Sequence, residues 1–323
     1  MQVVMRLTQI GHPGRSSSFL QILHIRKELM KPNLATDYDP ETLRFPVLYL
    51  PKIDGVRGLH LTGGLTGRSL KKFKNKYVTE RFRAACYAGL DGELAYGSRT
   101  SQSLCRDTTS ALNSIDGEPD VTWYVFDLLR PETVDLPYEA RHAALVEYVK
   151  LLEDPAVQVV PYRECHTLEH VQALHEDSVG YGYEGSILRD PKGRYKQGRS
   201  TVREGGYLRI KDFADAEALV LSIYEGQHNA NEATTNELGR TERSTHQENM
   251  VPNGMLGGLN CLYLGQEIKV SPGAMTHGER VKYFQHPELI VNKTIKFKSM
   301  VSGVKDKPRF ATFLTVRMDE DIS

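Results

Sequence analysis

The chain has 323 residues, of which 40% are apolar and 25% charged, and its formal net charge is zero. This length exceeds the roughly 250 residues at which single cores stop growing, so two domains are expected. The composition is that of an ordinary globular protein, and no apolar run approaches the roughly 20 residues of a membrane span, which argues against a membrane protein.

Residues up to about 213 are predicted to mix helices with mainly antiparallel sheet. Apolar side chains recur at helical spacing over residues 18–30 and 138–152, and a shorter helix is expected over 78–88. Strands are expected over 45–51, 57–63, 92–97 and 121–129. The turn signal Asp54-Gly55 places Lys52 at the end of a strand.

Beyond residue 213 the pattern changes to strands joined by turns, which predicts a small all-β barrel. The expected strands lie in 217–226, 259–273, 293–301 and 309–318, with one short helix near 278–286. Residues 225–258 contain no Phe, Tyr, Trp or Ile. We expect this segment not to order itself without a partner, because it has too little apolar surface to bury.

Cysteines and the N-terminus indicate the compartment. The four cysteines, Cys86, Cys105, Cys165 and Cys261, form no CxxC pair, which argues against a zinc site and a disulfide framework. The N-terminus has no sustained apolar segment followed by a small-residue cleavage site, so a cytoplasmic protein is expected, in a bacterium or a virus-infected host. No oligomerisation signal stands out, and we expect a monomer.

Basic residues gather in three stretches although the whole chain is neutral. Residues 66–83 carry seven basic side chains against Glu80 alone, and 192–211 and 293–309 are similarly unbalanced. One such stretch is typical of a solvated surface. Three of them, each beside a motif described below, favour phosphate binding.

Lys52 has the surroundings of a nucleophile, with Asp54, Gly55 and Arg57 directly behind it. A lysine amine attacks only when deprotonated, so its ordinary pKa of roughly 10.4 must be lowered by burial or by neighbouring cations. Taken alone, the motif also fits a strand-end lysine that reaches solvent beside a tight turn. The chain has no Gly-Lys dipeptide, which excludes a Walker A phosphate loop.

Further motifs follow Lys52 in a fixed order. They are TGRSLKKF at 66–73, LDGEL at 90–94, YVFDLL at 124–129, YEGSILRD at 183–190, YKQGRST at 195–201, LRIKDF at 208–213 and PRFATFLTVRMDED at 308–321. From KPNLA at 31 to the C-terminus, the ordered set resembles the covalent nucleotidyltransferase superfamily, and more narrowly the compact ATP-dependent DNA ligases of viruses and bacteria.

The resemblance implies an α+β fold of two domains. Residues 1–213 would form the nucleotidyltransferase domain of antiparallel sheets with helices, and 214–323 a small all-β OB-fold barrel. The polar insert at about 225–258 is similar to the flexible latch that orders on nicked duplex DNA in the smallest ligases. A hinge is expected near 212–216, so that the second domain can swing over the active site.

The implied reaction uses ATP and nicked duplex DNA. Lys52 attacks the α-phosphate of ATP, expels pyrophosphate and carries AMP as a phosphoramidate. The AMP then passes to the 5′-phosphate at a nick, and the adjacent 3′-hydroxyl displaces it. The implied metal is Mg2+, with Mn2+ as a substitute, organised by Glu184 and Asp54; Asp54 would also orient the nick hydroxyl.

The resemblance also assigns phosphate contacts. Arg209 and Lys211 are expected to clamp the α-phosphate, and their charge is expected to lower the pKa of Lys52. The family usually carries lysine at the position of Arg209, which puts the role of that residue in doubt. Arg68 would contact AMP and the nick phosphate, while Arg317 and the carboxylates after it would position the leaving pyrophosphate.

Contacts to the nucleoside are assigned to a second group. Glu93 and Arg57 would bind the ribose, and Phe126 would stack on the adenine. Leu50 and Ile53 flank Lys52 and complete the nucleotide-binding set. Leu50 stands where relatives often carry a polar residue, so base recognition is expected to use backbone groups.

Three alternatives remain open from the sequence. An mRNA-capping guanylyltransferase and an RNA ligase share the nucleophile motif, and a nucleic-acid clamp that has lost the reaction would share the fold. The ending PRF…RxDED and the element YKQGRST favour the DNA ligase. An NAD-dependent ligase is not expected, because there is no room for its cysteine zinc module.

Overall fold

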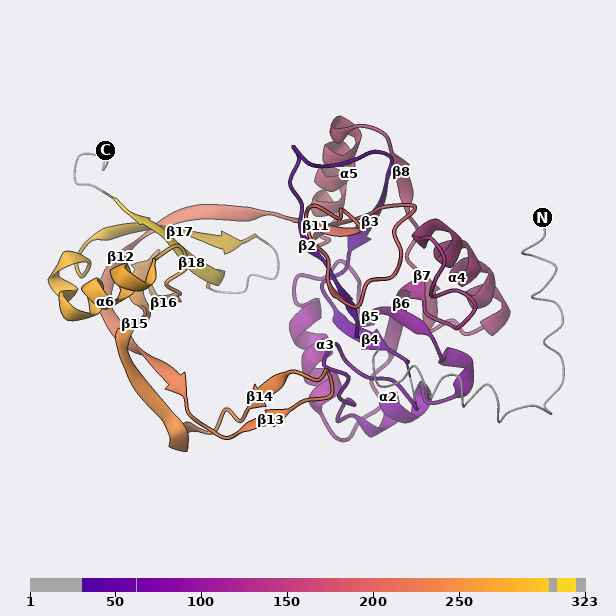
Figure 1. The fold of residues 1–323 in the computed structure, drawn as a ribbon, viewed down its shortest axis with the longest axis horizontal. Helices are drawn as coiled ribbons and strands as arrows, with labels where there is room; N and C mark the ends of the chain where they lie inside the picture. Colours follow the sequence, from indigo (N-terminus) through magenta and orange to yellow (C-terminus); the bar gives the residue numbers. More distant parts are fainter. Residues whose placement is uncertain (1–30, 62, 302–306, 318–323) are drawn as a thin grey trace.

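The structure is a computed structural model that describes residues 31–61, 63–301 and 307–317. The predicted helix over 18–30 and the carboxylates that follow Arg317 lie outside these residues. The chain forms two units, a first unit that ends with Lys211 and a C-terminal unit that begins with Phe213 (Figure 1).

Two sheets build the first unit, in the strand orders β2-β11-β9-β3-β8 and β4-β5-β6-β7. The first sheet contains β2 (Thr36–Asp37), β3 (Val47–Lys52), β8 (Arg163–Cys165), β9 (Gly185–Arg189) and β11 (Tyr207–Lys211). The second contains β4 (Val56–Leu59), β5 (Leu90–Tyr96), β6 (Val121–Leu128) and β7 (Val157–Val159). A short parallel pair joins β1 (Asn33–Leu34) to β10 (Gly198–Arg199). The expectation of mainly antiparallel sheet with helices is confirmed for this unit.

Helices cover the outer faces of both sheets. They are α2 (Lys76–Arg81), α3 (Leu104–Asn113), α4 (Tyr138–Leu152) and α5 (Leu168–Gly180), with a 3-10 turn at Ala85–Tyr87. The helix predicted over 138–152 is confirmed as α4, whereas the sequence reasoning missed α3 and α5. The helix predicted over 78–88 is confirmed only as far as Arg81, where α2 ends, and is wrong beyond that residue. The chain leaves α2 at Phe82, whose buried ring packs edge-on against Trp123 and Tyr87 at centroid distances of 5.4 and 5.3 Å, so tertiary packing overrides the local pattern.

A buried cluster between the two sheets supports the region around Lys52. It includes Leu48 and Leu50 from β3, Ala95 from β5 and Tyr124 from β6. The opposite face of the first sheet packs on α5. Because side chains alternate along a strand, the even-numbered residues of β3, which end with Lys52, face the space between the sheets.

The C-terminal unit is one antiparallel sheet whose two edges meet. Its strand order is β16-β15-β12-β17-β18. The strands are β12 (Phe213–Asn229), β15 (Met250–Tyr263), β16 (Gln266–Val270), β17 (Thr294–Met300) and β18 (Arg309–Val316), accompanied by α6 (His277–Gln285) and a 3-10 turn at Pro287–Leu289. Ser271, just after β16, bridges Thr312 of β18 and donates from its backbone to the Ala311 carbonyl at 2.9 Å. This bridge closes the sheet around a core that contains Val220 and Phe297.

The segment expected not to order itself instead carries strands. β12 and β15 continue into it as a pair, as far as Asn229 opposite Met250, and its tip forms a hairpin. The hairpin strands are β13 (Ala233–Thr235) and β14 (Thr241–Arg243), followed by a 3-10 turn at Gln247–Asn249. Backbone pairing and the buried Asn231 amide, which donates to the Ser244 and His246 carbonyls at 2.9 Å, replace the missing apolar core. Composition alone could not reveal this route to order.

The hairpin reaches back to the first unit, so the ribbon forms a ring around an open centre (Figure 1). Lys71 Nζ lies 3.0 Å from a Glu242 oxygen and 3.9 Å from a Glu237 oxygen. These are exposed ion pairs, which contribute little stability individually and weaken in salt. In the part of the chain that the structure describes, none of the helices combines the length and apolar character needed to span a bilayer.

Candidate active site

Three neighbouring strands bring Lys52, Glu184 and Lys211 together. Lys52 ends β3 and Lys211 ends β11, and Gly185 at the start of β9 pairs with both. The backbone amide of Glu184 donates to the Lys52 carbonyl at 3.0 Å. One carboxylate oxygen of Glu184 accepts from the Lys52 ammonium and the other from the Lys211 ammonium. A buried carboxylate therefore bridges the two lysines.

Gly185 makes this arrangement sterically allowed. Its φ is 152°, and a Cβ added there would lie 2.3 Å from the Ile210 carbonyl oxygen. The carboxylate of Glu184 turns toward Lys52, whereas the next side chain, Ser186, contacts residues on the α5 face. The glycine thus accompanies a break in the usual alternation that puts Glu184 on the lysine side.

The charges around Lys52 correct one prediction. Burial alone would raise the pKa of Glu184, but the ammonium groups of Lys52 and Lys211 outweigh it and lower that pKa to about 2. Burial would lower the pKa of Lys52, but the attraction of Glu184, followed by Glu93 and Asp54, raises it. The prediction that cationic neighbours lower the pKa of Lys52 is therefore wrong for this arrangement. The pKa of Lys211 is the one that is lowered, by burial and then by Lys52.

Arg57 links the neighbouring strands β4 and β5. Its Nε and Nη2 donate to the two oxygens of the buried Asp91 at 2.5 and 2.7 Å, and it stands opposite Glu93 in the strand register. Its guanidinium lies 4.7 Å from the centroid of the Phe126 ring. The predicted ribose and adenine residues are thus neighbours. Asp91 was missed, although a carboxylate inside the apolar strand LDGEL signals a buried partner.

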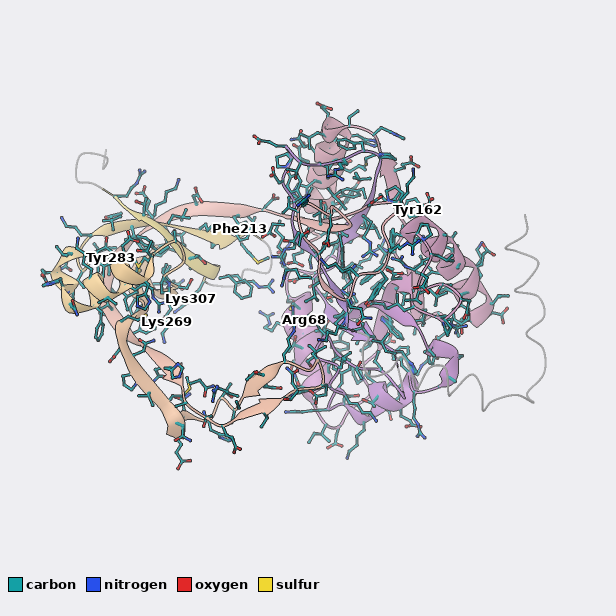
Figure 2. All side chains as sticks on the ribbon, in the orientation of Figure 1. Arg68, Tyr162, Phe213, Lys269, Tyr283 and Lys307 are labelled. Atoms are coloured by element: carbon teal, nitrogen blue, oxygen red, sulfur yellow. The ribbon has the colours of Figure 1, made fainter. Side chains whose placement is uncertain are left out.

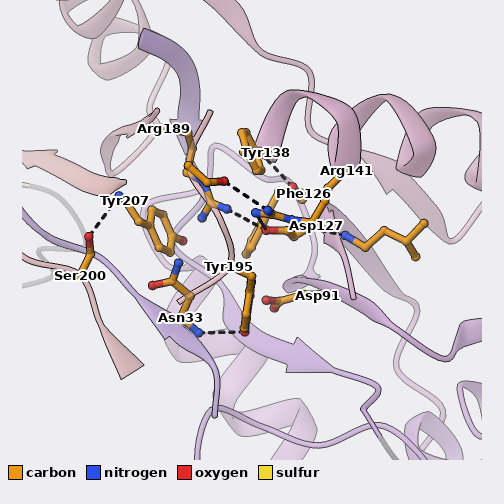
Figure 3. A network of polar contacts seen from close by, with 12 residues as sticks. Asn33, Asp91, Phe126, Asp127, Tyr138, Arg141, Arg189, Tyr195, Ser200 and Tyr207 are labelled. Carbon is orange, nitrogen blue, oxygen red and sulfur yellow. Dashed lines mark hydrogen bonds and ion pairs between the residues drawn. The ribbon is translucent and has the colours of Figure 1, made fainter. Parts of the chain in front are cut away.

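A buried charge network fixes the strand that carries Phe126 (Figure 3). Asp127 accepts from Arg141 at 2.7 and 3.0 Å and from Arg189 at 2.7 Å, and all three side chains are at most 3% exposed. Tyr138 donates to the Phe126 carbonyl at 3.0 Å. Because a buried ion of this kind is costly to leave unpaired, the network holds β6 and β9 in one arrangement. None of these four supporting residues was singled out from the sequence.

Leu50 and Ile53 form an apolar surface beneath Phe126. Their side chains are 3% and 5% exposed and belong to the buried cluster against which Phe126 packs. Neither offers a polar side-chain group to a base. Any polar recognition of adenine at these positions would have to use backbone groups.

Three predicted cations lie away from the carboxylate of Glu184. Arg209 Nε donates to Asp37 at 2.6 Å on the neighbouring strand β2. Arg68 is exposed, on the side of the first unit that faces the C-terminal unit (Figure 2). Arg317 belongs to the C-terminal unit, where its Nε donates to Glu217 at 2.6 Å. The expected phosphate clamp of Arg209 is therefore engaged elsewhere in this arrangement.

Arg309 is a charged residue near the site that was not singled out. Its Nη1 donates to Asp54 at 2.6 Å, across the two units. A cavity of about 640 Å³, lined by this ion pair and by residues of α3, lies beside it. The next residue, Phe310, is 66% exposed with φ of 57°. A strained, exposed aromatic beside an ion pair is a signal that only the structure provides.

The carboxylates near Lys52 supply the oxygen ligands that a magnesium ion prefers. Within the described ranges no group of three or more His, Cys, Asp or Glu residues forms a preformed cage for a metal. Magnesium needs no such cage, because it commonly takes one or two carboxylates and completes its shell with phosphate oxygens and water. Burial raises the pKa of Glu93 to about 7, with Glu184 and Asp54 adding to the effect. Crowded carboxylates of this kind are suited to a cation.

Known proteins are similar to this chain in sequence and in fold. The family model described as "ATP dependent DNA ligase domain" matches residues 46–211, just over half of the chain. The DNA ligase of African swine fever virus (strain Badajoz 1971 Vero-adapted) is 24% identical over 139 residues, which are 43% of this chain and 32% of that protein. The match therefore spans about a third of the length of that curated relative.

Two solved structures extend the similarity over both units. The Chlorella virus DNA ligase-adenylate is 26% identical, with a TM-score of 0.51, and the match covers 91% of this chain and all of that chain. A structure from a study of Lig E DNA ligases is 23% identical, with a TM-score of 0.65 over 89% of this chain and 99% of that chain. The second likeness concerns the fold alone. The matched region, 46–211, contains Lys52, Glu184 and Lys211, and the chain belongs to the ATP-dependent DNA ligase domain family.

Proposed function

We propose that this protein is an ATP-dependent DNA ligase that seals nicks in duplex DNA. The observation that carries the proposal is the meeting of Lys52, Glu184 and Lys211 at the ends of three neighbouring strands, in a chain of this family. A non-catalytic clamp would not need a buried carboxylate that bridges two lysines at this point. The site roles that follow belong to the same proposal.

The first step forms a bond between Lys52 and AMP. The Nζ of Lys52 attacks the α-phosphorus of ATP, a P–N bond forms, and the bond to the pyrophosphate oxygen breaks, so pyrophosphate leaves. Lys211 contacts the same Glu184 carboxylate as Lys52, so its ammonium group lies beside the nucleophile. From there it would stabilise negative charge on the α-phosphate. Arg57 and Glu93 would hold the ribose, and Phe126 would stack on the adenine.

The two later steps transfer the AMP. An oxygen of the DNA 5′-phosphate attacks the AMP phosphorus and frees Lys52. The 3′-hydroxyl across the nick then loses its proton and attacks the 5′-phosphorus, which releases AMP and leaves a phosphodiester. Each step develops charge on phosphate oxygens, so positioning and electrostatic stabilisation supply most of the catalysis.

Magnesium is part of the proposal, held by Glu184 and Asp54. Lys52 attacks only as a free amine, whereas the surrounding carboxylates raise its pKa. A bound Mg2+ would offset this negative charge and stabilise the charge that develops on the phosphate oxygens. Both carboxylates are held by basic side chains, Glu184 by Lys52 and Lys211 and Asp54 by Arg309, so these ion pairs would have to open on loading.

The C-terminal unit is proposed to be an OB-fold that begins after Asp212. Its five strands close through Ser271 and Thr312, and α6 lies between β16 and β17 along the chain, which supports this assignment. The insert at 225–258 is proposed to close around the duplex. The hairpin is held to the first unit by exposed ion pairs between Lys71 and Glu237 and Glu242, which are weak in salt. These contacts would let the ring open to admit DNA.

Labelled nucleotides test the first step. The intact chain is incubated with α-labelled ATP or GTP and magnesium, and the protein-bound label is measured after acid and after alkali. We expect an acid-labile label from ATP that is absent in Lys52→Ala and retained in the control Lys150→Ala, an exposed lysine on α4. Label from GTP alone would instead indicate a capping enzyme.

Transfer assays test the substrate. AMP-loaded protein is offered nicked duplex DNA, nicked duplex RNA and hybrids, and the sealed strand is measured. Sealing of DNA is expected, whereas sealing confined to RNA would contradict the proposal. Limited proteolysis then tests the ring: residues 225–258 should be protected by nicked DNA, and equal cleavage with and without DNA would count against encirclement.

A further inference from the structure

A single residue joins the two units along the chain. β11 ends at Lys211 and β12 begins at Phe213, so only Asp212 lies between them. β12 is a 17-residue strand in the centre of the C-terminal sheet, and it leaves the first unit at Phe213 (Figure 2). The backbone direction at Asp212 therefore determines where the C-terminal unit lies.

A histidine of α5 holds Asp212 from the side. His175 Nε2 lies 2.9 Å from Asp212 Oδ1, and its Nδ1 lies 2.8 Å from the Ser186 hydroxyl. The Ser186 hydroxyl in turn lies 2.6 Å from the Tyr49 hydroxyl. Since a carboxylate can only accept, Nε2 donates to Asp212, while the Ser186 hydroxyl holds the other edge of the ring through Nδ1. The Tyr49 hydroxyl donates to the Leu174 carbonyl at 2.7 Å and thereby ties Ser186 to α5.

Residues 211 and 212, which connect the two units, are held on both faces of the first sheet by the segment 184–186. On the lysine face, Glu184 accepts from Lys211. On the α5 face, Ser186, two residues further along, anchors the histidine that binds Asp212. Consecutive residues 211 and 212 are thus tied to residues 184 and 186, just before and just inside β9. Beyond Asp212 the chain belongs to the C-terminal sheet, because Phe213 pairs with Met300 and the Asp212 carbonyl accepts from the Val301 amide at 3.4 Å.

Burial alone does not require the contact between His175 and Asp212. The Asp212 side chain is 43% exposed, whereas that of His175 is 12% exposed. Water could solvate the carboxylate, so the hydrogen bond from His175 serves to orient the connection. A nucleophilic role for the Ser-His-Asp arrangement is excluded, because Ser186 is 0% exposed beneath α5 and no substrate can reach it.

We propose that His175 is a positioning residue that fixes Asp212 against β9 and thereby sets the direction in which β12 carries the C-terminal unit relative to Lys52 and Asp54. The contact between Arg309 and Asp54 depends on this direction, because Arg309 belongs to the C-terminal unit. The effect on nick sealing rests on the proposed function; the effect on the placement of the units does not.

The placement of the units is measured by pulsed EPR. One spin label sits on the exposed Cys86 of the first unit, and the other on Leu264→Cys, at a position 83% exposed in the turn between β15 and β16, with Cys105 replaced by serine. We expect one narrow distance distribution in the parent protein and a broader, shifted one in His175→Ala. The control His170→Ala, an exposed histidine on the same helix, should match the parent.

Two conservative variants separate positioning from packing. Glutamine places a donor near the position of Nε2, so His175→Gln should restore the narrow distribution, whereas asparagine reaches only the position of Nδ1 and should not. Asp212→Ala, which leaves the packing of α5 intact, should broaden the distribution as His175→Ala does, and the double variant should add nothing further. Unchanged distances in Asp212→Ala, or additive effects in the double variant, would overturn the proposal even if His175→Ala folds poorly.

Sealing gives the functional readout. A hydrogen bond to a charged partner is worth roughly tenfold in an equilibrium, so we expect kcat for nick sealing to fall roughly tenfold in His175→Ala with KM for ATP unchanged. A change in KM for ATP with kcat unchanged would contradict a role on the side of the sheet away from the nucleotide. If the parent protein takes no label from ATP, the proposed function fails while the EPR distances still test His175.

Discussion

Replacing Glu93 by glutamine should make the protein more stable above neutral pH while removing a contact proposed for the ribose. Burial raises the pKa of Glu93 from 4.5 to about 7, with the nearby charges of Lys52 and Arg57 opposing this rise. Between these two values the unfolded chain is ionised and the folded chain is still protonated, so stability falls as pH rises and levels off above 7. One pKa unit is worth about 1.4 kcal/mol. With a discount for the partial exposure of Glu93, its ionised carboxylate destabilises the folded state by about 2 kcal/mol above neutral pH.

Urea unfolding at about pH 5 and about pH 8 measures this effect. The single tryptophan, Trp123, is buried in the first unit, so its fluorescence reports the unit that holds Glu93. The advantage of Glu93→Gln over the parent should grow by about 1.5 kcal/mol between these pH values, because part of the cost is already present at about pH 5, whereas the exposed Glu176→Gln should show no such growth. The same variant should lose labelling from ATP. A stability difference that is equal at both pH values would refute the reasoning.

Three further predictions follow from other contacts. Gly185→Ala should lose more than about 2 kcal/mol of stability in thermal unfolding, since its Cβ would lie 2.3 Å from a backbone oxygen; a variant that melts with the parent would show that the strands relax. Lys71→Glu should make the hairpin more sensitive to protease at low salt and Glu242→Lys should restore protection in the double variant, as the ion pair at 3.0 Å requires; cleavage that ignores both charges would contradict the contact. Arg309→Ala removes the pair with Asp54, so solution scattering should report a larger radius of gyration, and an unchanged radius would show that other contacts hold the units.

The local parts of the fold were predictable because their signals are local. The apolar spacing of 138–152 marks α4 to the residue, and the apolar run at 121–129 marks β6. Helices α3 and α5 carry polar residues over most of their length, and the structure buries only Leu104, Thr108 and Leu112 of the first. Their stability comes from the sheets they cover, which no window of sequence contains.

The residues of the site were found through the order of motifs, whereas their partners were not. A pattern can indicate that Lys52 and Lys211 are basic and near a phosphate site, but it gives no strand order. Only the order β11-β9-β3 reveals that one carboxylate, Glu184, lies between them. Counting cations along the chain therefore gave the wrong direction for the pKa of Lys52.

The same reasoning explains why Arg209 and Asp54 bind partners that the sequence did not indicate. Arg209 stands on a strand whose neighbour β2 presents Asp37 in register, and the Asp37 carboxylate binds its guanidinium at 2.6 Å. Asp54 meets Arg309, which is 255 residues distant in the chain. Charged side chains bind the opposite charge that the fold places nearest. Ligand binding at this site must then exchange ion pairs, so its affinity will depend on these competing contacts as much as on the groups that touch the nucleotide.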